Sequence, residues 1–203
     1  MTRFVLASAN PDKAREITDV LREAQTDVEL TPRPDDVNEV DENGATLEDN
    51  ARLKAVALCA AVQLPAIADD TGLEVEALDG RPGVRSARYA GDSATYADNV
   101  AKLLRELAGL PLERRAARFS TVAIARWPDG REVAALGTVE GVITDAPRGQ
   151  HGFGYDPVFV PLEGDGRTFA EMAPPEKHAL SHRGRAFRTL ARGVQAVLEA
   201  ERA

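Results

Sequence analysis

The chain has few cysteine, histidine and aromatic residues, and these shortages exclude several classes of protein. Among 203 residues there are one cysteine, Cys59, and three histidines, while aromatic residues make up 5%. A single thiol cannot close a disulfide within the chain, so a disulfide-stabilised secreted scaffold is excluded. Cys59 lies in the apolar run 57–61, which indicates a small buried side chain rather than a reactive thiol.

Long hydrophobic runs are also missing. The first apolar segment spans only residues 4–7, which is too short for the core of a signal peptide or for a membrane-spanning helix. We therefore expect the chain to reside in the reducing cytoplasm and to have no membrane partner.

The charge balance is acidic, with 33 acidic against 25 basic residues and a formal net charge of -8. An acidic surface disfavours non-specific binding to a nucleic acid polymer. It does not exclude a small triphosphate, because nearby lysines and a divalent cation can outweigh the global field. Hydrophobic residues make up 43% of the chain, which is enough for the core of one large domain.

The order of the expected elements favours an α/β fold with a mixed sheet. Apolar patterns predict strands at 3–7, 28–30, 66–68 and 158–160, extended chain at 73–78, and a long hairpin of 117–127 and 132–142. Helices are predicted from Asn10-Pro11 onward, at 46–63 after a capping box, at 95–108 and at 181–201, with short helical pieces near Phe169 and Pro175. Residues 31–43 read as a loop, and no repeat or linker interrupts one domain over 1–203.

The segment Ser8-Ala9-Asn10-Pro11-Asp12-Lys13 joins the first strand to the first helix. We expect unpaired backbone N–H groups at this helix start, where they would suit a phosphate. Lys13 is unfavourable for the helix dipole in the first turn, and a bound triphosphate would offset that cost. An ordinary capped surface helix explains the same residues, and the glycines and Lys-Ser/Thr pair of a P-loop are missing.

Two adjacent carboxylates, Asp69 and Asp70, follow an apolar strand that we expect to end at Ala68. Such neighbours repel each other unless one meets a cation or a hydrogen-bond donor. Successive residues of a strand point to opposite faces, so we expect one of the two to be structural and the other to lie in the site. A polar cap between strand and turn is the alternative.

Two further charged residues, Glu42 and Lys54, say little by themselves. Glu42 falls in the acidic stretch 40–44 and reads as a solvated loop residue. Lys54 lies inside the second helix and reads as an ordinary exposed lysine.

A glycine-flanked aromatic loop occupies residues 151–157. Glycine lets the backbone approach a planar ligand closely, and Phe153 or Tyr155 could stack on a base. A tight turn with core aromatics is the alternative.

His178 and His182 are four residues apart, as in a metal-binding pair, but no third ligand is close in the sequence. The other interpretation makes Ser181 a helix cap and uses His182 and Arg183 as hydrogen-bond donors at the start of the last helix.

Six motifs in order make the chain resemble the noncanonical purine nucleoside triphosphate pyrophosphatases, also called inosine triphosphate pyrophosphatases. The motifs span residues 6–13, 50–55, 68–73, 82–89, 152–157 and 181–184. Each is weak alone, but their order and spacing over nearly the full length are specific. The resemblance is greatest to bacterial members, which act on dITP, ITP and XTP.

The resemblance implies an elongated, two-lobed α/β domain with a central mixed sheet flanked by helices, an active site in the cleft between the lobes, and a homodimer. It also implies hydrolysis of ITP, dITP and XTP to the monophosphate and pyrophosphate with Mg²⁺. Water would attack the α-phosphorus, and Asp70 would receive or orient the proton. A pyrophosphatase for other modified nucleotides and a nucleotide-binding sensor without turnover are the alternatives.

The resemblance also implies roles for individual residues. Asp70 would be catalytic and would bind the metal together with Glu42, although the neighbouring Asp41 stays an alternative to Glu42. The phosphates would be bound by Ser8, Ala9, Asn10, Pro11, Asp12, Lys13 and Lys54, with Thr71 also contacting the substrate. The base pocket would be formed by Phe153, Gly154, Tyr155, Asp156, Lys177, His182 and Arg183.

Two positions depart from the family pattern. Ala9 stands where many members have glycine, which would narrow the freedom of the backbone near the phosphates. His151 stands where many members have a second glycine before Gly152, which would change the mobility of that loop.

Overall fold

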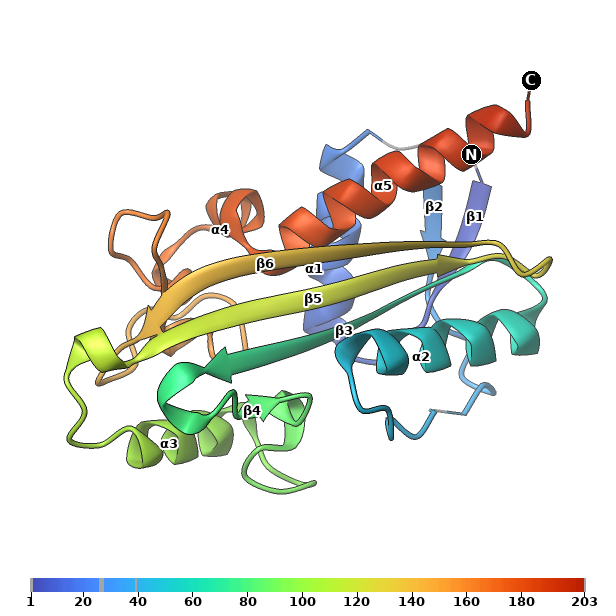
Figure 1. Ribbon diagram of the computed structural model, residues 1–203. Coiled ribbons are helices and arrows are strands. Elements are labelled where there is room, and N and C mark those ends of the chain that lie inside the picture. The colour runs from blue at the N-terminus through green and yellow to red at the C-terminus, as the bar shows by residue number, and fades with distance from the viewer. Residues whose placement is uncertain (1, 26–27, 39, 203) are drawn as a thin grey trace. The chain divides into compact units, whose positions relative to one another are not determined.

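The protein has the expected mixed α/β fold, as its computed structural model shows for residues 2–25, 28–38 and 40–202. A seven-stranded sheet has the order β2-β1-β3-β5-β6-β7, and β4 pairs with β3 (Figure 1). Strand β1 is parallel to β2 and β3, whereas the pairs β3–β4 and β6–β7 are antiparallel. The strands are β1 Thr2–Leu6, β2 Val28–Thr31, β3 Ala66–Val75, β4 Pro82–Gly83, β5 Ala116–Arg126, β6 Glu132–Ile143 and β7 Phe159–Pro161.

The helices begin where the sequence supplies a cap. Asn10 caps α1 by accepting hydrogen bonds from the N–H groups of Asp12 and Lys13, with a proline in the first turn. Thr46 and Thr95 start α2 and α3 with complete capping boxes, as the sequence predicted for Thr46. The helices are α1 Pro11–Glu23, α2 Leu47–Val62, α3 Tyr96–Glu106, α4 Pro174–Leu180 and α5 His182–Ala200.

Strand β3 corrects one expectation from the sequence. The strand does not end at Ala68 but continues through Asp69 and Asp70 to Val75. Residues 76–78, expected to be extended, form a 3-10 turn. The acidic pair therefore lies in the middle of a strand, and each carboxylate belongs to one face of the sheet.

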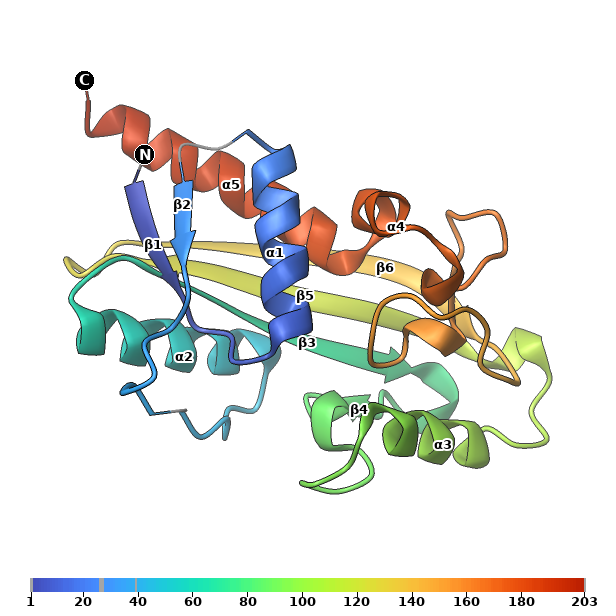
Figure 2. The ribbon, with the colours of Figure 1, turned by 180° about the vertical axis from the view of Figure 1, so that it is seen from behind.

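The chain divides into two compact units. The first comprises Met1–Asp70, Thr121–Gly137 and Arg183–Ala203, and the second comprises Thr71–Ser120 and Thr138–His182. In the first unit, α1 and α5 cover one face of the sheet and α2 covers the other (Figures 1 and 2).

Alternation along the strands sets these two faces of the first unit. On β1, Phe4 and Leu6 pack toward α1 and α5, whereas Val5, and Ala7 just after the strand, pack toward α2. On β3, Ile67 follows the first group, and Ala66 and Ala68 follow the second. This period of two carries on to the acidic pair that comes next in the chain.

The second unit has its own apolar core. Residues of α3 pack with the aromatic side chains of Tyr155, Phe159 and Phe169. The C-terminal parts of β3 and β6 and the N-terminal part of β5 complete this core. Cys59 is buried in the first unit, as its sequence context predicted. Among the described residues, none of the helices combines the length and the apolar character that crossing a membrane requires.

Candidate active site

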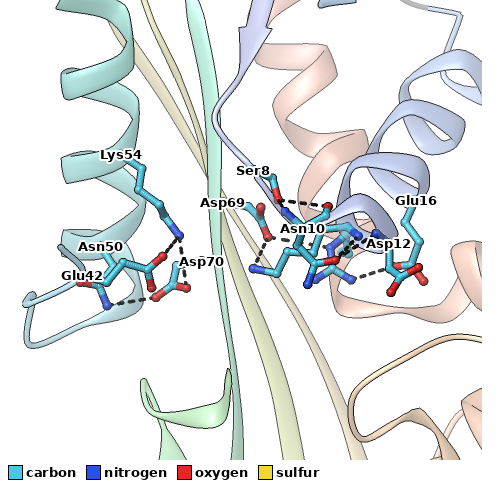
Figure 3. Close-up of polar contacts among 11 residues, drawn as sticks. Ser8, Asn10, Asp12, Glu16, Glu42, Asn50, Lys54, Asp69 and Asp70 are labelled. Carbon is cyan, nitrogen blue, oxygen red and sulfur yellow. Dashed lines mark hydrogen bonds and ion pairs between the residues drawn. The ribbon is translucent and has the colours of Figure 1, made fainter. Parts of the chain in front are cut away.

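Asp69 and Asp70 face opposite sides of the sheet and have different partners. Asp69 lies on the side of α1, and Asp70 lies on the side of α2, as Figure 3 shows. Their side chains are only 1% and 7% exposed. The strand therefore places two buried carboxylates that are adjacent in sequence on opposite faces of the sheet. Each one needs a cationic partner on its own face.

The carboxylate of Asp69 is held by two cations. Lys13 Nζ lies 3.3 Å from Asp69 Oδ2, and Arg183 Nε lies 3.8 Å from the same oxygen. Arg183 also donates to Glu16 Oε2 at 2.7 Å, which connects α5 to α1. Burial raises the pKa of Asp69, but Lys13, Arg183 and Lys54 outweigh this effect and leave the pKa below its usual value. Asp69 is therefore held as a charged anchor for Lys13.

The carboxylate of Asp70 has a different environment. Asn50 Nδ2 donates to Asp70 Oδ2 at 3.1 Å, and Lys54 Nζ lies 3.5 Å from Asp70 Oδ1. Burial is the largest influence on the pKa of Asp70, and with nearby Glu42 it raises that pKa despite the two lysines and the Asn50 hydrogen bond. The charge of Asp70 is thus incompletely compensated by the protein, unlike that of Asp69.

Lys54 is not the exposed lysine that its sequence context suggested. Its side chain is 15% exposed, and its ammonium donates to Glu42 Oε1 at 2.8 Å while facing Asp70. Burial lowers the pKa of Lys54, but the carboxylates of Asp70, Asp69 and Glu42 raise it overall. One buried ammonium therefore lies where two carboxylates converge (Figure 3).

The start of α1 differs from the expectation of free backbone donors. The N–H groups of Asp12 and Lys13 donate to Asn10 Oδ1 at 3.0 and 3.2 Å, and Asn10 N donates to Ser8 Oγ at 3.3 Å. These amides already have protein acceptors, and the ammonium of Lys13 is the one cationic group that residues 8–13 offer to an anion. The sequence could not show this, since an Asn cap and a phosphate compete for the same donors.

The residues around Asp70 fit the Mg²⁺ that the family resemblance implies. Mg²⁺ in nucleotide sites takes one or two carboxylates and completes its shell with water and substrate phosphates. Glu42 and Asp70 supply two carboxylates, and the Lys54 ammonium now lies beside both of them. Asp41 is exposed, whereas Glu42 is half-buried against Lys54, so the geometry favours Glu42 as the second ligand.

His178 and His182 do not form part of a metal-binding cluster among the described residues. Within the described part of the chain, no group of three or more His, Cys, Asp or Glu side chains is arranged to hold a metal ion. Instead, the ring of His182 stacks on Phe119 with ring centroids 4.4 Å apart and planes 12° apart.

In the second unit, the aromatic loop is organised around a buried ion pair. Asp156 Oδ2 accepts hydrogen bonds from Phe153 N at 2.8 Å and from Lys177 Nζ at 2.5 Å. The Lys177 ammonium lies 5.0 Å from the ring centroid of Phe153, in the range of a cation–π contact. The half-buried ring of Phe153 also faces Tyr96, with centroids 5.7 Å apart. Among the predicted base-pocket residues, Phe153 is the one whose ring is placed to stack on a base.

Other predicted base-pocket residues have structural partners. Tyr155 belongs to the apolar core and donates to the backbone oxygen of Ser86 at 2.9 Å, so its ring is not available for stacking. Lys177, His182 and Arg183 are each 3% exposed or less, and Lys177 and Arg183 are paired with carboxylates. A base would reach these donors only after part of that pairing opened. Thr71 follows Asp70 on β3 and is half-buried, and Gly154 has a positive φ of 61°.

The two departures from the family pattern cause no backbone strain. Ala9 and His151 are exposed, and neither is among the residues with positive φ. Alanine and histidine therefore adopt their backbone conformations without the cost that glycine would avoid.

Two polar residues of the site had no assigned role from sequence. Asn50 binds the Asp70 carboxylate, and Glu16 binds Arg183. An asparagine one position after the Thr46-x-x-Asp49 capping box was the available signal for Asn50. Nothing in the sequence connects Glu16 with Arg183, which is 167 residues away.

The fold and the site together define an α/β protein in which two adjacent carboxylates of β3 lie beside lysines from α1 and α2. A sequence profile of the Ham1 family matches residues 4–193. The chain is 47% identical over 191 residues to a dITP/XTP pyrophosphatase of Geobacillus kaustophilus, covering 94% of this chain and 93% of that protein. It is 48% identical over 193 residues to a dITP/XTP pyrophosphatase of Nitratidesulfovibrio vulgaris, covering 92% and 93%.

A solved structure gives the same result. A HAM1 protein from Coxiella burnetii matches with a TM-score of 0.85 and 38% sequence identity, covering 96% of this chain and 98% of that one. This chain belongs to the Ham1 family. The family expected from the six sequence motifs is thereby confirmed.

Proposed function

We propose that this chain hydrolyses dITP, ITP and XTP to the corresponding nucleoside monophosphate and pyrophosphate. Its relatives in Geobacillus kaustophilus and Nitratidesulfovibrio vulgaris are dITP/XTP pyrophosphatases and align over more than nine-tenths of its length. The observation that carries the proposal is the convergence of Glu42 and Asp70 on Lys54. Asp69, the preceding residue of β3, pairs with Lys13 of α1. Carboxylates for a cation and amines for phosphates are the groups that this reaction requires.

The proposed reaction breaks the bond between the α-phosphorus and the oxygen that leads to the β-phosphate. Water attacks the α-phosphorus, and Asp70 accepts or orients the proton that the water loses. Lys13 and Lys54 stabilise the negative charge that develops on the leaving pyrophosphate. Glu42 and Asp70 would hold a Mg²⁺ ion, which would act as a Lewis acid toward the phosphate oxygens. The protein contributes mainly positioning and electrostatics and forms no covalent intermediate with the substrate.

Selection of the base is proposed to depend on donors. A 6-keto purine presents an acceptor where adenine presents an amino group, so protein donors at that position favour hypoxanthine and xanthine. Leaving such a donor unpaired costs about 1–3 kcal/mol. Phe153 would stack on the base, and Lys177, at 5.0 Å from the Phe153 ring centroid, is a candidate donor beside that ring.

The direct test is pyrophosphate release from dITP, ITP, XTP, GTP and ATP, each with and without Mg²⁺. The proposal predicts turnover of the first three that requires Mg²⁺, and much lower kcat/KM for ATP. Equal kcat/KM for all five nucleotides would refute the selectivity. Binding of dITP without any release of pyrophosphate would instead support the nucleotide-sensor alternative.

A homodimer and a cytoplasmic location also stay predictions. Both follow from the resemblance stated above and from the composition of the chain. Sedimentation equilibrium at micromolar protein concentration would test the dimer, and a mass of one chain at all concentrations would contradict it.

A further inference from the structure

Asn50 connects the Asp70 carboxylate to the backbone of the loop that carries Glu42. Its side chain is buried, with 1% of the residue exposed, at the fourth position of α2. The amide nitrogen donates to Asp70 Oδ2 at 3.1 Å, and the amide oxygen accepts from Gly44 N at 2.8 Å. One end of the amide therefore binds Asp70 on β3 (Figure 3). The other end binds the acidic loop that precedes α2.

The loop contact requires glycine at position 44. A Cβ placed on Gly44 would lie 2.6 Å from Asp49 Cβ and 2.7 Å from Asn50 Oδ1, closer than atoms of this kind approach. The backbone of the loop can thus reach the Asn50 amide only because Gly44 has no side chain. Glu42 is two residues earlier, and its carboxylate is then within 2.8 Å of Lys54.

We propose that Asn50 is a positioning residue that sets the separation and orientation of the Glu42 and Asp70 carboxylates for a divalent cation. This inference rests on the proposed function and deepens it. By donating to Oδ2 of Asp70, Asn50 fixes the carboxylate plane and turns Oδ1 toward Lys54. By accepting from Gly44, it keeps the Glu42 loop beside the same helix. Residues that orient metal ligands in this way contribute strongly to metal affinity.

A second asparagine provides a matched control within the same chain. The segments 46–50 and 95–99 both read Thr-x-x-Asp-Asn, and both begin a helix with a capping box. Asn99 is 2% exposed and accepts from Ala90 N at 2.7 Å, just as Asn50 accepts from Gly44. Its amide nitrogen, however, donates to the backbone oxygen of Ala87 at 3.0 Å and not to a carboxylate.

The comparison of the two asparagines isolates the proposed role. The capping box and the burial at the fourth helical position are common to both, so they belong to the local structure of a helix start. Only Asn50 directs its donor to a carboxylate. A purely structural role therefore predicts similar consequences for both alanine variants, and a positioning role predicts different ones.

The test is a titration of the substrate-free protein with Mn²⁺, followed by electron paramagnetic resonance of the free ion. The variants are Asn50→Ala, Gly44→Ala and Asn99→Ala, and thermal unfolding is recorded for each. We expect Asn50→Ala and Gly44→Ala to bind Mn²⁺ about 10-fold or more weakly than the wild type. Asn99→Ala should lower the unfolding temperature and leave the Mn²⁺ affinity unchanged.

Steady-state kinetics with dITP provides the second measurement. Asn50→Ala should need a higher Mg²⁺ concentration for half-maximal rate and should lose kcat with little change in KM. Wild-type Mn²⁺ affinity and Mg²⁺ dependence in Asn50→Ala would overturn the inference, whatever its stability. Wild-type protein that binds no Mn²⁺ up to millimolar concentration would overturn it too.

Failure of the proposed function gives a different result. Wild-type protein that releases no pyrophosphate from dITP or XTP would refute the function. The Mn²⁺ affinities of Asn50→Ala and Asn99→Ala would still show whether Asn50 positions a cation site.

Discussion

Asp69 and Asp70 are neighbours on β3, yet their carboxylates lie on opposite faces of the sheet and bind different lysines. Asp69 pairs with Lys13 of α1, and Asp70 lies beside Lys54 of α2. Their pKa values shift in opposite directions, downward for Asp69 and upward for Asp70. The protein therefore stabilises the negative charge of Asp69. It compensates the charge of Asp70 only in part, which suits the proposed role of Asp70 as a ligand of a cation.

This difference predicts that substitution of Asp69 lowers stability, whereas substitution of Asp70 affects activity and not stability. Asp69→Asn removes a buried charge and leaves Lys13 and Arg183 without their shared partner, which should lower the free energy of unfolding by about 3 kcal/mol. Asp70→Asn removes a charge that the folded state disfavours, so its unfolding free energy should change little or rise. Urea denaturation of both variants is the measurement. Equal destabilisation by the two substitutions would contradict the assignment.

Alanine should destabilise the protein more at one glycine of the aromatic loop than at the other. Gly152 and Gly154 have φ values of 70° and 61°, so alanine is strained at both positions. At Gly152, the new Cβ would also lie 2.0 Å from Asp156 Oδ2, whereas nothing lies within 4 Å at Gly154. Gly154→Ala should cost about 1 kcal/mol of unfolding free energy, and Gly152→Ala should cost clearly more.

Thermal unfolding of the two glycine variants measures this difference. The Gly152→Ala variant should also lose substrate selectivity, because Asp156 holds both Phe153 and Lys177. Gly154→Ala is the control with the same backbone strain. Equal melting temperatures would show that the Asp156 contact does not organise the loop.

The thiol of Cys59 should be inert while the chain is folded. The residue is 3% exposed, and burial raises the pKa of its thiol, so little reactive thiolate is present at neutral pH. Reaction with a disulfide reagent should be slow in buffer and should yield one thiol per chain in denaturant. Rapid labelling of the native protein would contradict the packing around α2.

Glu176 should stabilise the fold only above mildly acidic pH. It accepts from Arg167 at 2.7 Å and from Ala173 N at 2.8 Å, and these hydrogen bonds lower its pKa from 4.5 to about 2. A carboxylate with a lowered folded-state pKa stabilises the folded state above its unfolded pKa and loses that effect as the pH falls toward the folded value. The stability difference between wild type and Glu176→Gln should therefore shrink between pH 5 and pH 2.

The pH effect has an internal control. Glu113 is exposed, so Glu113→Gln changes the net charge by the same amount without removing these hydrogen bonds. Chemical denaturation at several pH values gives the free energies. A stability difference for Glu176→Gln that stays constant from pH 5 to pH 2 would refute the role of the carboxylate.

Local signals in the sequence predicted much of the fold. Asn10-Pro11 and the Thr46 capping box marked helix starts, and Pro128-Asp129-Gly130 marked the turn of the β5–β6 hairpin. These features depend on residues within a few positions of one another, which is why a single sequence reveals them.

The continuation of β3 through two acids was not predictable in the same way. Asp69 and Asp70 interrupt the apolar pattern of the strand. The strand continues through them because Lys13 of α1 and Lys54 of α2 lie beside their buried carboxylates. The burial of Lys54, Lys177 and Arg183 likewise depends on carboxylates far away in the sequence. Contacts of this kind are set by the tertiary fold, so the site residues could be named but their pairing could not.

The central claim is best tested by the rate of pyrophosphate release from dITP and Mg²⁺ by wild type and Asp70→Asn, with folding of the variant verified. The account predicts turnover by the wild type and a loss on the order of 10²–10³ in kcat for the variant, together with undiminished stability. Near-normal turnover by a folded Asp70→Asn variant would contradict it.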